Sequence, residues 1–130
     1  MNKNKQEDPP IKHCEITVTK LDDGSYEASY EPKVITVTDN DTILSFKLVQ
    51  APADVIIRSV SINPEDQDQL STPSISRHGN HVTLSDVNTQ RDTFHLDFTY
   101  GSKKGEKLAV AAAKMGVMGG LYPEISNDPP

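Results

Sequence analysis

The stretch that most constrains the fold is FHLDFTY, residues 94–100, in which apolar and polar side chains alternate strictly. The apolar side chains that share one side of an extended chain are Phe94, Leu96, Phe98 and Tyr100. His95, Asp97 and Thr99 fall on the opposite side. A period of two is the signature of a β-strand with one buried and one solvated face. We therefore predict a core strand here, with its polar face in water.

Shorter alternating runs precede this strand and are separated by turn-forming residues. They cover residues 11–19, 26–30, 35–37, 44–48, 55–62, 75–77 and 82–84. Strands that recur about every 8 to 12 residues with turns between them are typical of a β-sandwich. We predict an all-β fold, an antiparallel immunoglobulin-like β-sandwich of about seven or eight strands. The run 55–62 has apolar residues on both sides, which predicts burial on both faces. Residues 121–125 contain Pro123, which favours a last edge strand.

The first hairpin has a register that can be argued from its buried face. A three-residue loop at 22–24 sets Val18 opposite Ala28 and Ile16 opposite Tyr30, which keeps one face apolar. It also places Gly24 third, where this loop needs a left-handed residue, so we predict a positive φ at Gly24.

A second hairpin leads to a metal-binding hypothesis. Gly79-Asn80 is a two-residue hairpin signal that sets Ile75 opposite Leu84, and His78 would then lie directly opposite His81. Two imidazoles at that separation are a weak candidate site for zinc or nickel. The alternative is an exposed hairpin tip, because the local sequence supplies no further ligand.

Other chemistry finds less support in the residue types. A blue-copper site needs a cysteine near its other ligands, but Cys14, the one cysteine, lies in the first predicted strand and faces inward as a buried thiol. Carboxylates in the 39–41 and 65–68 turns do not match the strong calcium-loop motif, and they are ordinary turn formers. No catalytic motif is present, so we expect a protein that is not an enzyme and needs no cofactor. A hydrolase with a site assembled from distant strands stays a third hypothesis, which needs a pocket of converging polar groups.

The length and the net charge of the chain limit how many domains it can form and which partners it can bind. The chain has 130 residues, which suits one domain over 11–130 preceded by a polar arm, residues 1–10, ending in Pro9-Pro10. A net charge of −6 argues against binding to nucleic-acid phosphates. The sequence has no apolar run of about 20 residues and no apolar signal segment, so no membrane span is expected. Together with the single cysteine, this favours a cytoplasmic location.

The C-terminal run LAVAAAKMGVM, residues 108–118, departs from the strand pattern. Its alanines favour a helix and its glycines weaken one, so a short helix, a loop and an edge strand all stay open. This extra Ala/Gly-rich segment is apolar, and the edges of a sandwich must be covered or paired. We therefore predict a structural or protein-interaction module that binds itself or another protein. The residues proposed for its contact surface are Leu108, Val110, Met115, Met118, Leu121 and Tyr122.

The sequence contains the segments ITVTDNDTILSFKLVQ and SINPEDQDQLSTPSIS and closes with YPEISNDPP. Together these segments resemble the small bacterial DP-EP family, and the likeness covers residues 11–100 and 121–130. That family is named for an Asp-Pro and a Glu-Pro pair, where this chain has Tyr122-Pro123 and Asp128-Pro129. The run 108–120 looks like an addition. The resemblance implies a compact β-sandwich of uncharacterised function and supplies no site residues.

Overall fold

A computed structural model describes residues 9–112 and 123–130 of the chain. These residues form strands joined by turns and loops, and none of them lies in a helix. The part described accordingly offers no helix that could cross a membrane. The first six strands are β1 (Ile11–Lys20), β2 (Tyr26–Glu31), β3 (Val34–Val37), β4 (Thr42–Gln50), β5 (Val55–Asn63) and β6 (Ser74–Ile75). They are followed by β7 (His81–Asp86), β8 (Thr93–Ser102), β9 (Lys107–Leu108), β10 (Val110–Ala112) and β11 (Glu124–Asn127).

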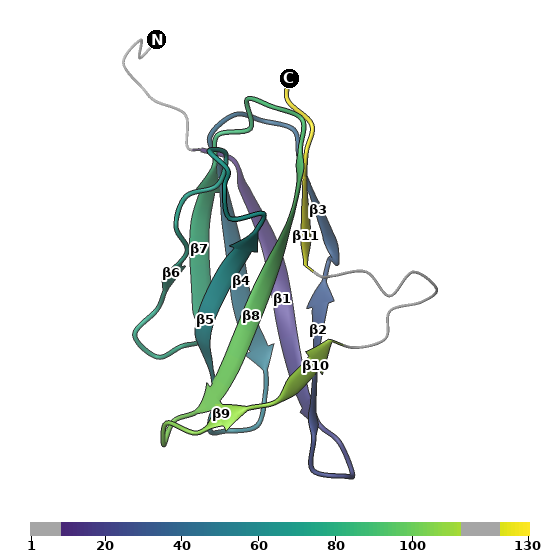
Figure 1. Ribbon diagram of the computed structural model, residues 1–130, viewed down its shortest axis with the longest axis vertical. Helices are drawn as coiled ribbons and strands as arrows, with labels where there is room; N and C mark the ends of the chain where they lie inside the picture. The colour runs from purple at the N-terminus through teal and green to yellow at the C-terminus, as the bar shows by residue number, and fades with distance from the viewer. Residues whose placement is uncertain (1–8, 113–122) are drawn as a thin grey trace, which may run out of the picture.

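The strands form two sheets that share one core (Figure 1). The six-stranded sheet has the order β10-β2-β1-β4-β7-β6. The five-stranded sheet has the order β3-β11-β8-β5, with β9 paired to β8. The all-β prediction is therefore confirmed.

Both sheets are mixed, so the prediction of purely antiparallel sheets is wrong. β1 pairs with β4 in parallel, and the β10–β2 and β11–β3 pairs are parallel as well. The cause is the path of the chain after β2. At Pro32 the chain leaves the six-stranded sheet, forms β3 at the edge of the other sheet, and returns as β4 beside β1 in the same direction.

Aromatic rings from both sheets meet in the core. Phe98 of β8 contacts Phe46 of β4 and Tyr30 of β2, with ring centroids 5.4 and 5.5 Å apart. The hydroxyls of Tyr30 and Tyr100 are 2.9 Å apart and form a buried hydrogen bond between the sheets. The predicted inward face of residues 94–100 is buried, while Asp97 is exposed and His95 is half-buried.

The first hairpin has the predicted register. Ile16 pairs with Tyr30 and Val18 with Ala28. The Leu21 amide donates to the Ser25 carbonyl at 2.7 Å, which leaves residues 22–24 as the loop. Gly24 has a φ of 88°, as the three-residue loop requires.

The expectation that β5 is buried on both faces is wrong, and a β-bulge explains the misleading pattern. The register with β8 shifts between Ile57 and Ser59. Before the shift Val55 and Ile57 are buried, and after it Val60 and Ile62 are the side chains packed against the core. A bulge inserts one residue and so switches which side chains point inward.

The last strand is also placed differently from the prediction. β11 lies between β3 and β8 rather than at an edge. Pro123 immediately precedes β11, and its carbonyl accepts the Leu96 amide at 3.0 Å. Because proline is compatible with the start of a strand, it does not exclude an inner position.

Candidate functional surfaces

The two histidines of the metal hypothesis do not face each other. β6 pairs with β7 so that Ile75 lies opposite Val82, not Leu84. The Ser76 amide donates to the His81 carbonyl at 2.8 Å, which makes residues 77–80 a four-residue loop and leaves His78 within it. His78 and His81 line different depressions of the surface. The predicted register is wrong because the loop is two residues longer than Gly79-Asn80 alone indicates. No group of three or more His, Cys, Asp or Glu that could hold a metal occurs in the described residues.

His81 instead contacts a serine on the outer face of the six-stranded sheet. Its Nε2 lies 2.6 Å from the Ser45 hydroxyl, in a depression of about 460 Å³ that is also lined by His13, Glu15 and Lys47. A serine beside an imidazole is the core of many hydrolase sites. Acyl transfer also needs backbone donors for an oxyanion, and Ser45 sits within β4, whose backbone is paired with β1 and β7 on both sides. The strand backbone around Ser45 is therefore already paired with its two neighbouring strands.

Cys14 is buried in the core, as predicted from its strand position. Its side chain is 1% exposed, and its thiol lies 3.5 Å from the Pro32 carbonyl oxygen. Burial raises the pKa of the thiol to about 12. A thiol of this kind is nearly all protonated at neutral pH, which makes it a poor nucleophile and a poor metal ligand.

The predicted C-terminal contact surface is described in part. Leu108 lies in β9 and Val110 in β10, so the segment begins as strand rather than helix. Both side chains are half-buried against the core. β10 pairs in parallel with β2 and forms one edge of the six-stranded sheet. Met115, Met118, Leu121 and Tyr122 lie outside the described residues.

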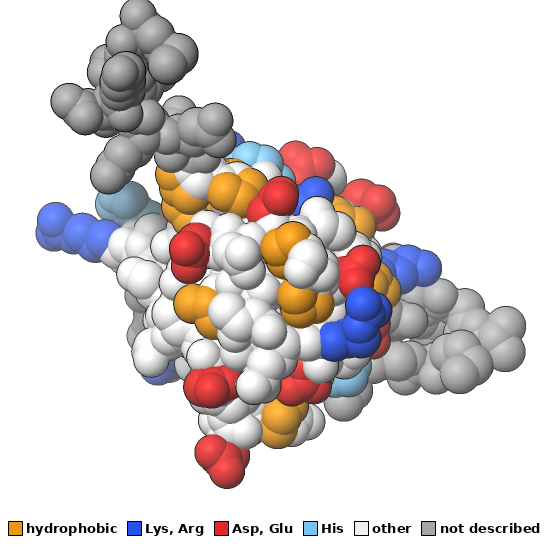
Figure 2. All heavy atoms as spheres, turned by 90° about the horizontal axis from the view of Figure 1, so that it is seen from above, with side chains coloured by type: hydrophobic (Ala, Val, Ile, Leu, Met, Phe, Trp, Pro, Cys, Tyr) orange, Lys and Arg blue, Asp and Glu red, His pale blue; other side chains and the backbone are white. Residues whose placement is uncertain are grey.

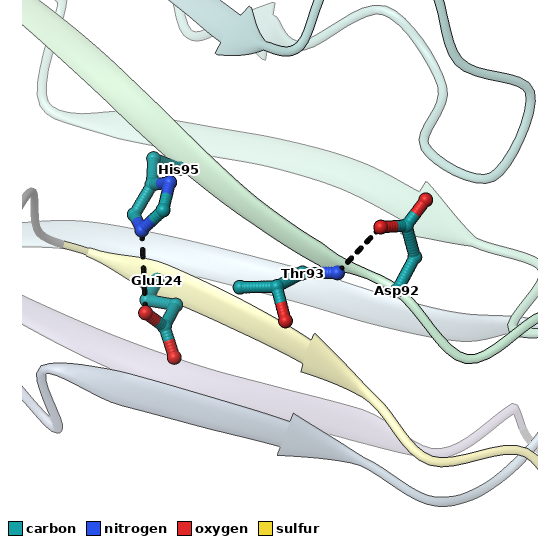
Figure 3. A network of polar contacts seen from close by, with 4 residues as sticks. All are labelled: Asp92, Thr93, His95 and Glu124. Carbon is teal, nitrogen blue, oxygen red and sulfur yellow. Dashed lines mark hydrogen bonds and ion pairs between the residues drawn. The ribbon is translucent and has the colours of Figure 1, made fainter.

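The outer face of the five-stranded sheet carries a row of polar contacts (Figure 3). His95 of β8 and Glu124 of β11 point toward each other, with Nε2 and Oε1 3.2 Å apart. Where β8 begins, the Asp92 carboxylate accepts the Thr93 amide at 2.8 Å. A half-exposed pair of this kind contributes little to stability. It joins β11 to β8 at the start of β11.

A groove lies where the β4–β5, β6–β7 and β8–β9 connections meet, at the lower end of the molecule in Figure 1. It has a volume of about 550 Å³, and its charged or ionisable lining side chains are Arg77, His78 and Lys103. The rest of the lining is apolar or uncharged and comes from residues 48–53, from Val55 and Ile56, and from Asn80. We call this feature the cationic groove. Among the described residues, no carboxylate lines it.

Backbone hydrogen bonds hold the wall of the cationic groove in place. The carbonyls of Gly79 and Asn80 accept the amides of Ile57 and Leu48 at 2.7 and 2.9 Å, and so tie the loop to both sheets. Gly79 has a φ of 70°, and a Cβ there would lie 2.8 Å from the Ile56 Cβ. The loop therefore requires glycine at this position, for both its conformation and its close approach to β5. The Lys103 amide donates to the Asp54 carbonyl at 2.8 Å, which fixes the second wall.

The opposite end of the molecule is acidic (Figure 2). The β3–β4, β5–β6 and β7–β8 connections meet there. Their exposed carboxylates belong to Asp39, Asp41, Glu65, Asp66, Asp68 and Asp92. Arg91 is the cation within these three connections, and it pairs with Asp128 at 2.8 Å. We call this region the acidic end.

Beneath the acidic end lies a buried polar cluster of Asp86, Asn88 and Asn127. Asp86 and Asn88 are 0% exposed and Asn127 is 1% exposed. One carboxylate oxygen of Asp86, Oδ1, accepts two hydrogen bonds. The Asn88 backbone amide donates one at 2.9 Å, and the Asn127 side-chain amide donates the other at 3.1 Å. Burial raises the pKa of Asp86 above its ordinary value, and the bonds from Asn127 and Asn88 oppose that shift.

Sequence reasoning missed the groove and the buried cluster for a physical reason. Each is assembled from segments far apart in the chain, and strand periodicity does not show which loops share an end of the molecule. A usable signal was present in the loop compositions. Residues 64–73 contain three carboxylates and no lysine or arginine, whereas Lys103 and Lys104 are adjacent in the β8–β9 turn.

Comparisons with known proteins do not identify a family for this chain. No protein-family model matches the chain, and no curated protein matches it at a significant level.

Proposed function

We propose that this chain is a non-catalytic structural module that associates with further copies of itself, end to end. The observation that carries the proposal is the segregation of charge between the acidic end and the cationic groove. Two sheets around one core support the finer assignment to immunoglobulin-like β-sandwiches, and the likeness to the DP-EP family remains a prediction.

The proposed contact seats the 64–68 loop of one copy in the cationic groove of the next. Glu65, Asp66 and Asp68 are exposed on that loop, and Arg77 and Lys103 line the groove. Opposite charges that face each other steer the encounter of two copies and fix their register. The chain as a whole has a net charge of −6 and would repel an acidic loop. The described lining of the cationic groove instead offers that loop Arg77 and Lys103 and contains no carboxylate.

The two contact surfaces are different, so the association is heterologous. A head-to-tail contact leaves a free acidic end and a free groove after each addition, and it generates rings or open filaments. A second copy suits this role because one chain carries both complementary surfaces. The predicted C-terminal surface, of which Leu108 and Val110 are described, would then lie along the side of such an assembly.

Sedimentation velocity at low and high salt tests the proposal. Surface charges more than about 8–10 Å apart are screened at physiological ionic strength, so association should weaken steeply between 25 and 500 mM NaCl. Lys103→Glu should weaken association at least about tenfold, or about 1.4 kcal/mol. Lys47→Glu is the matched control, because it makes the same charge change on the outer face of β4. Equal weakening by both variants, or a wild-type monomer at low salt, would reject the proposal.

A further inference from the structure

Among the residues that the structure describes, three buried side-chain oxygens beneath the acidic end have no hydrogen-bond partner. They are Asp86 Oδ2, Asn88 Oδ1 and Asn127 Oδ1. A buried acceptor without a partner destabilises the folded state, and more so when it carries charge. Three such atoms in one connected cluster therefore call for a shared partner.

The donors of the cluster are already used. Asn88 Nδ2 donates to the carbonyls of Val37 and Asp39, at 3.0 and 3.2 Å. Asn127 Nδ2 donates to Asp86 Oδ1. Turning either amide over would break these bonds and would point a donor away from its acceptor. The three oxygens therefore need a cation or further hydrogen-bond donors. Rearranging the existing side chains would not supply either.

Oxygen atoms from one carboxylate and two amides are ligands that hard cations prefer. Calcium in particular is bound by Asp carboxylates together with Asn and backbone carbonyls. The carboxylates of Asp39 and Asp41, whose turn does not match the calcium-loop motif, are not members of this cluster.

A surface depression rich in oxygen borders the cluster at Asn127. Asn127 lines a depression of about 480 Å³ together with Asp92, Asp128 and the hydroxyls of Thr36, Thr93 and Ser126. Arg91 also borders the depression, but its side chain is 77% exposed and paired with Asp128. The carboxylates of the acidic end attract cations to this opening. We propose that Asp86, Asn88 and Asn127 form the inner half of a binding site for a hard divalent cation, with Ca²⁺ as the best match.

Calcium titration of the full chain by calorimetry tests the site, with protein first treated with EDTA. It is done in 0.3 M NaCl, where the end-to-end contact is expected to be screened, so the two proposals fail separately. Wild type should bind one Ca²⁺, and Asp86→Asn should bind at least tenfold more weakly. Asp66→Asn is the matched control, because it removes an exposed charge of the same end and should bind like wild type.

A second variant keeps the test decisive if Asp86→Asn does not fold. Asn127→Asp places a second carboxylate against Asp86, which should lower the melting temperature without a cation and raise it sharply with Ca²⁺. Mg²⁺ should substitute poorly, because it demands a smaller octahedral shell. No binding by wild type at millimolar Ca²⁺, equal binding by Asp86→Asn, or no calcium response of Asn127→Asp would overturn the inference.

Discussion

Asn127 donates its side-chain amide to the carboxylate of Asp86 at 3.1 Å, and this bond joins β11 of one sheet to the end of β7 in the other. It lies beside the C-terminal residues and beneath the acidic loops. The bond couples the position of the last strand to the ionisation of a buried acid.

That coupling predicts how stability depends on pH. Because burial raises the pKa of Asp86 above its ordinary 3.8, the folded state favours the protonated form more than the unfolded state does. The contribution of Asp86 to stability is therefore fully present below pH 3.8 and is lost as the pH rises through the folded-state pKa. Asp86→Asn lacks this titration. In EDTA, its free energy of unfolding relative to wild type should improve between pH 4 and pH 7, measured by urea unfolding. A constant difference across that range would refute the shifted pKa.

The bond between the Tyr30 and Tyr100 hydroxyls predicts a non-additive pair of mutations. Tyr30→Phe or Tyr100→Phe leaves one buried hydroxyl without its partner, which should cost about 1–2 kcal/mol. The double variant removes both hydroxyls and should cost clearly less than the sum. Urea unfolding of the four proteins gives the coupling energy. Strict additivity would show that the two hydroxyls do not support each other.

Two glycines with positive φ should respond differently to alanine. Gly24, at 88°, has no atom within 4 Å of an added Cβ, so Gly24→Ala should cost about 1 kcal/mol from backbone strain alone. Gly79→Ala adds a collision with Ile56 and should cost more, about 2–4 kcal/mol. It should also weaken self-association at low salt, because the same loop carries Arg77 and His78. Equal losses of stability would contradict the close approach of the loop to β5.

The sequence predicts the elements of this fold better than it predicts their arrangement. Alternation correctly locates the inward faces of β1, β2 and β8, because burial of one face leaves a period of two. The first hairpin register follows in the same way, from matching apolar faces and a glycine that needs a positive φ. These are local properties, which a single stretch of chain can encode.

The order and pairing of the strands depend on contacts between distant segments, and no local sequence pattern encodes them. The parallel pairing of β1 with β4 depends on where the chain crosses between sheets, and the inner position of β11 depends on β3 and β8 flanking it. The apolar residues on both sides of β5 gave a wrong prediction of burial because a bulge changes the parity of the strand. The loop at 77–80 is longer than its Gly79-Asn80 pair indicates, because Ser76 pairs with His81 through the backbone. The prediction that His78 and His81 face each other assumed the shorter loop, and it is wrong for that reason.

The most direct test of end-to-end association mixes two variants that each lack one contact surface. Arg77→Glu with Lys103→Glu reverses the charge of the cationic groove, and Asp66→Asn with Asp68→Asn removes two of the three charges of the acidic loop, so the two altered surfaces do not attract each other. Each double variant should sediment as a monomer at 25 mM NaCl, where the wild type associates further. Mixed in equal amounts, they retain one intact groove and one intact loop, and should form a dimer containing one copy of each that stops growing. A mixture that stays monomeric while the wild type associates, or a variant that still polymerises alone, would contradict the account.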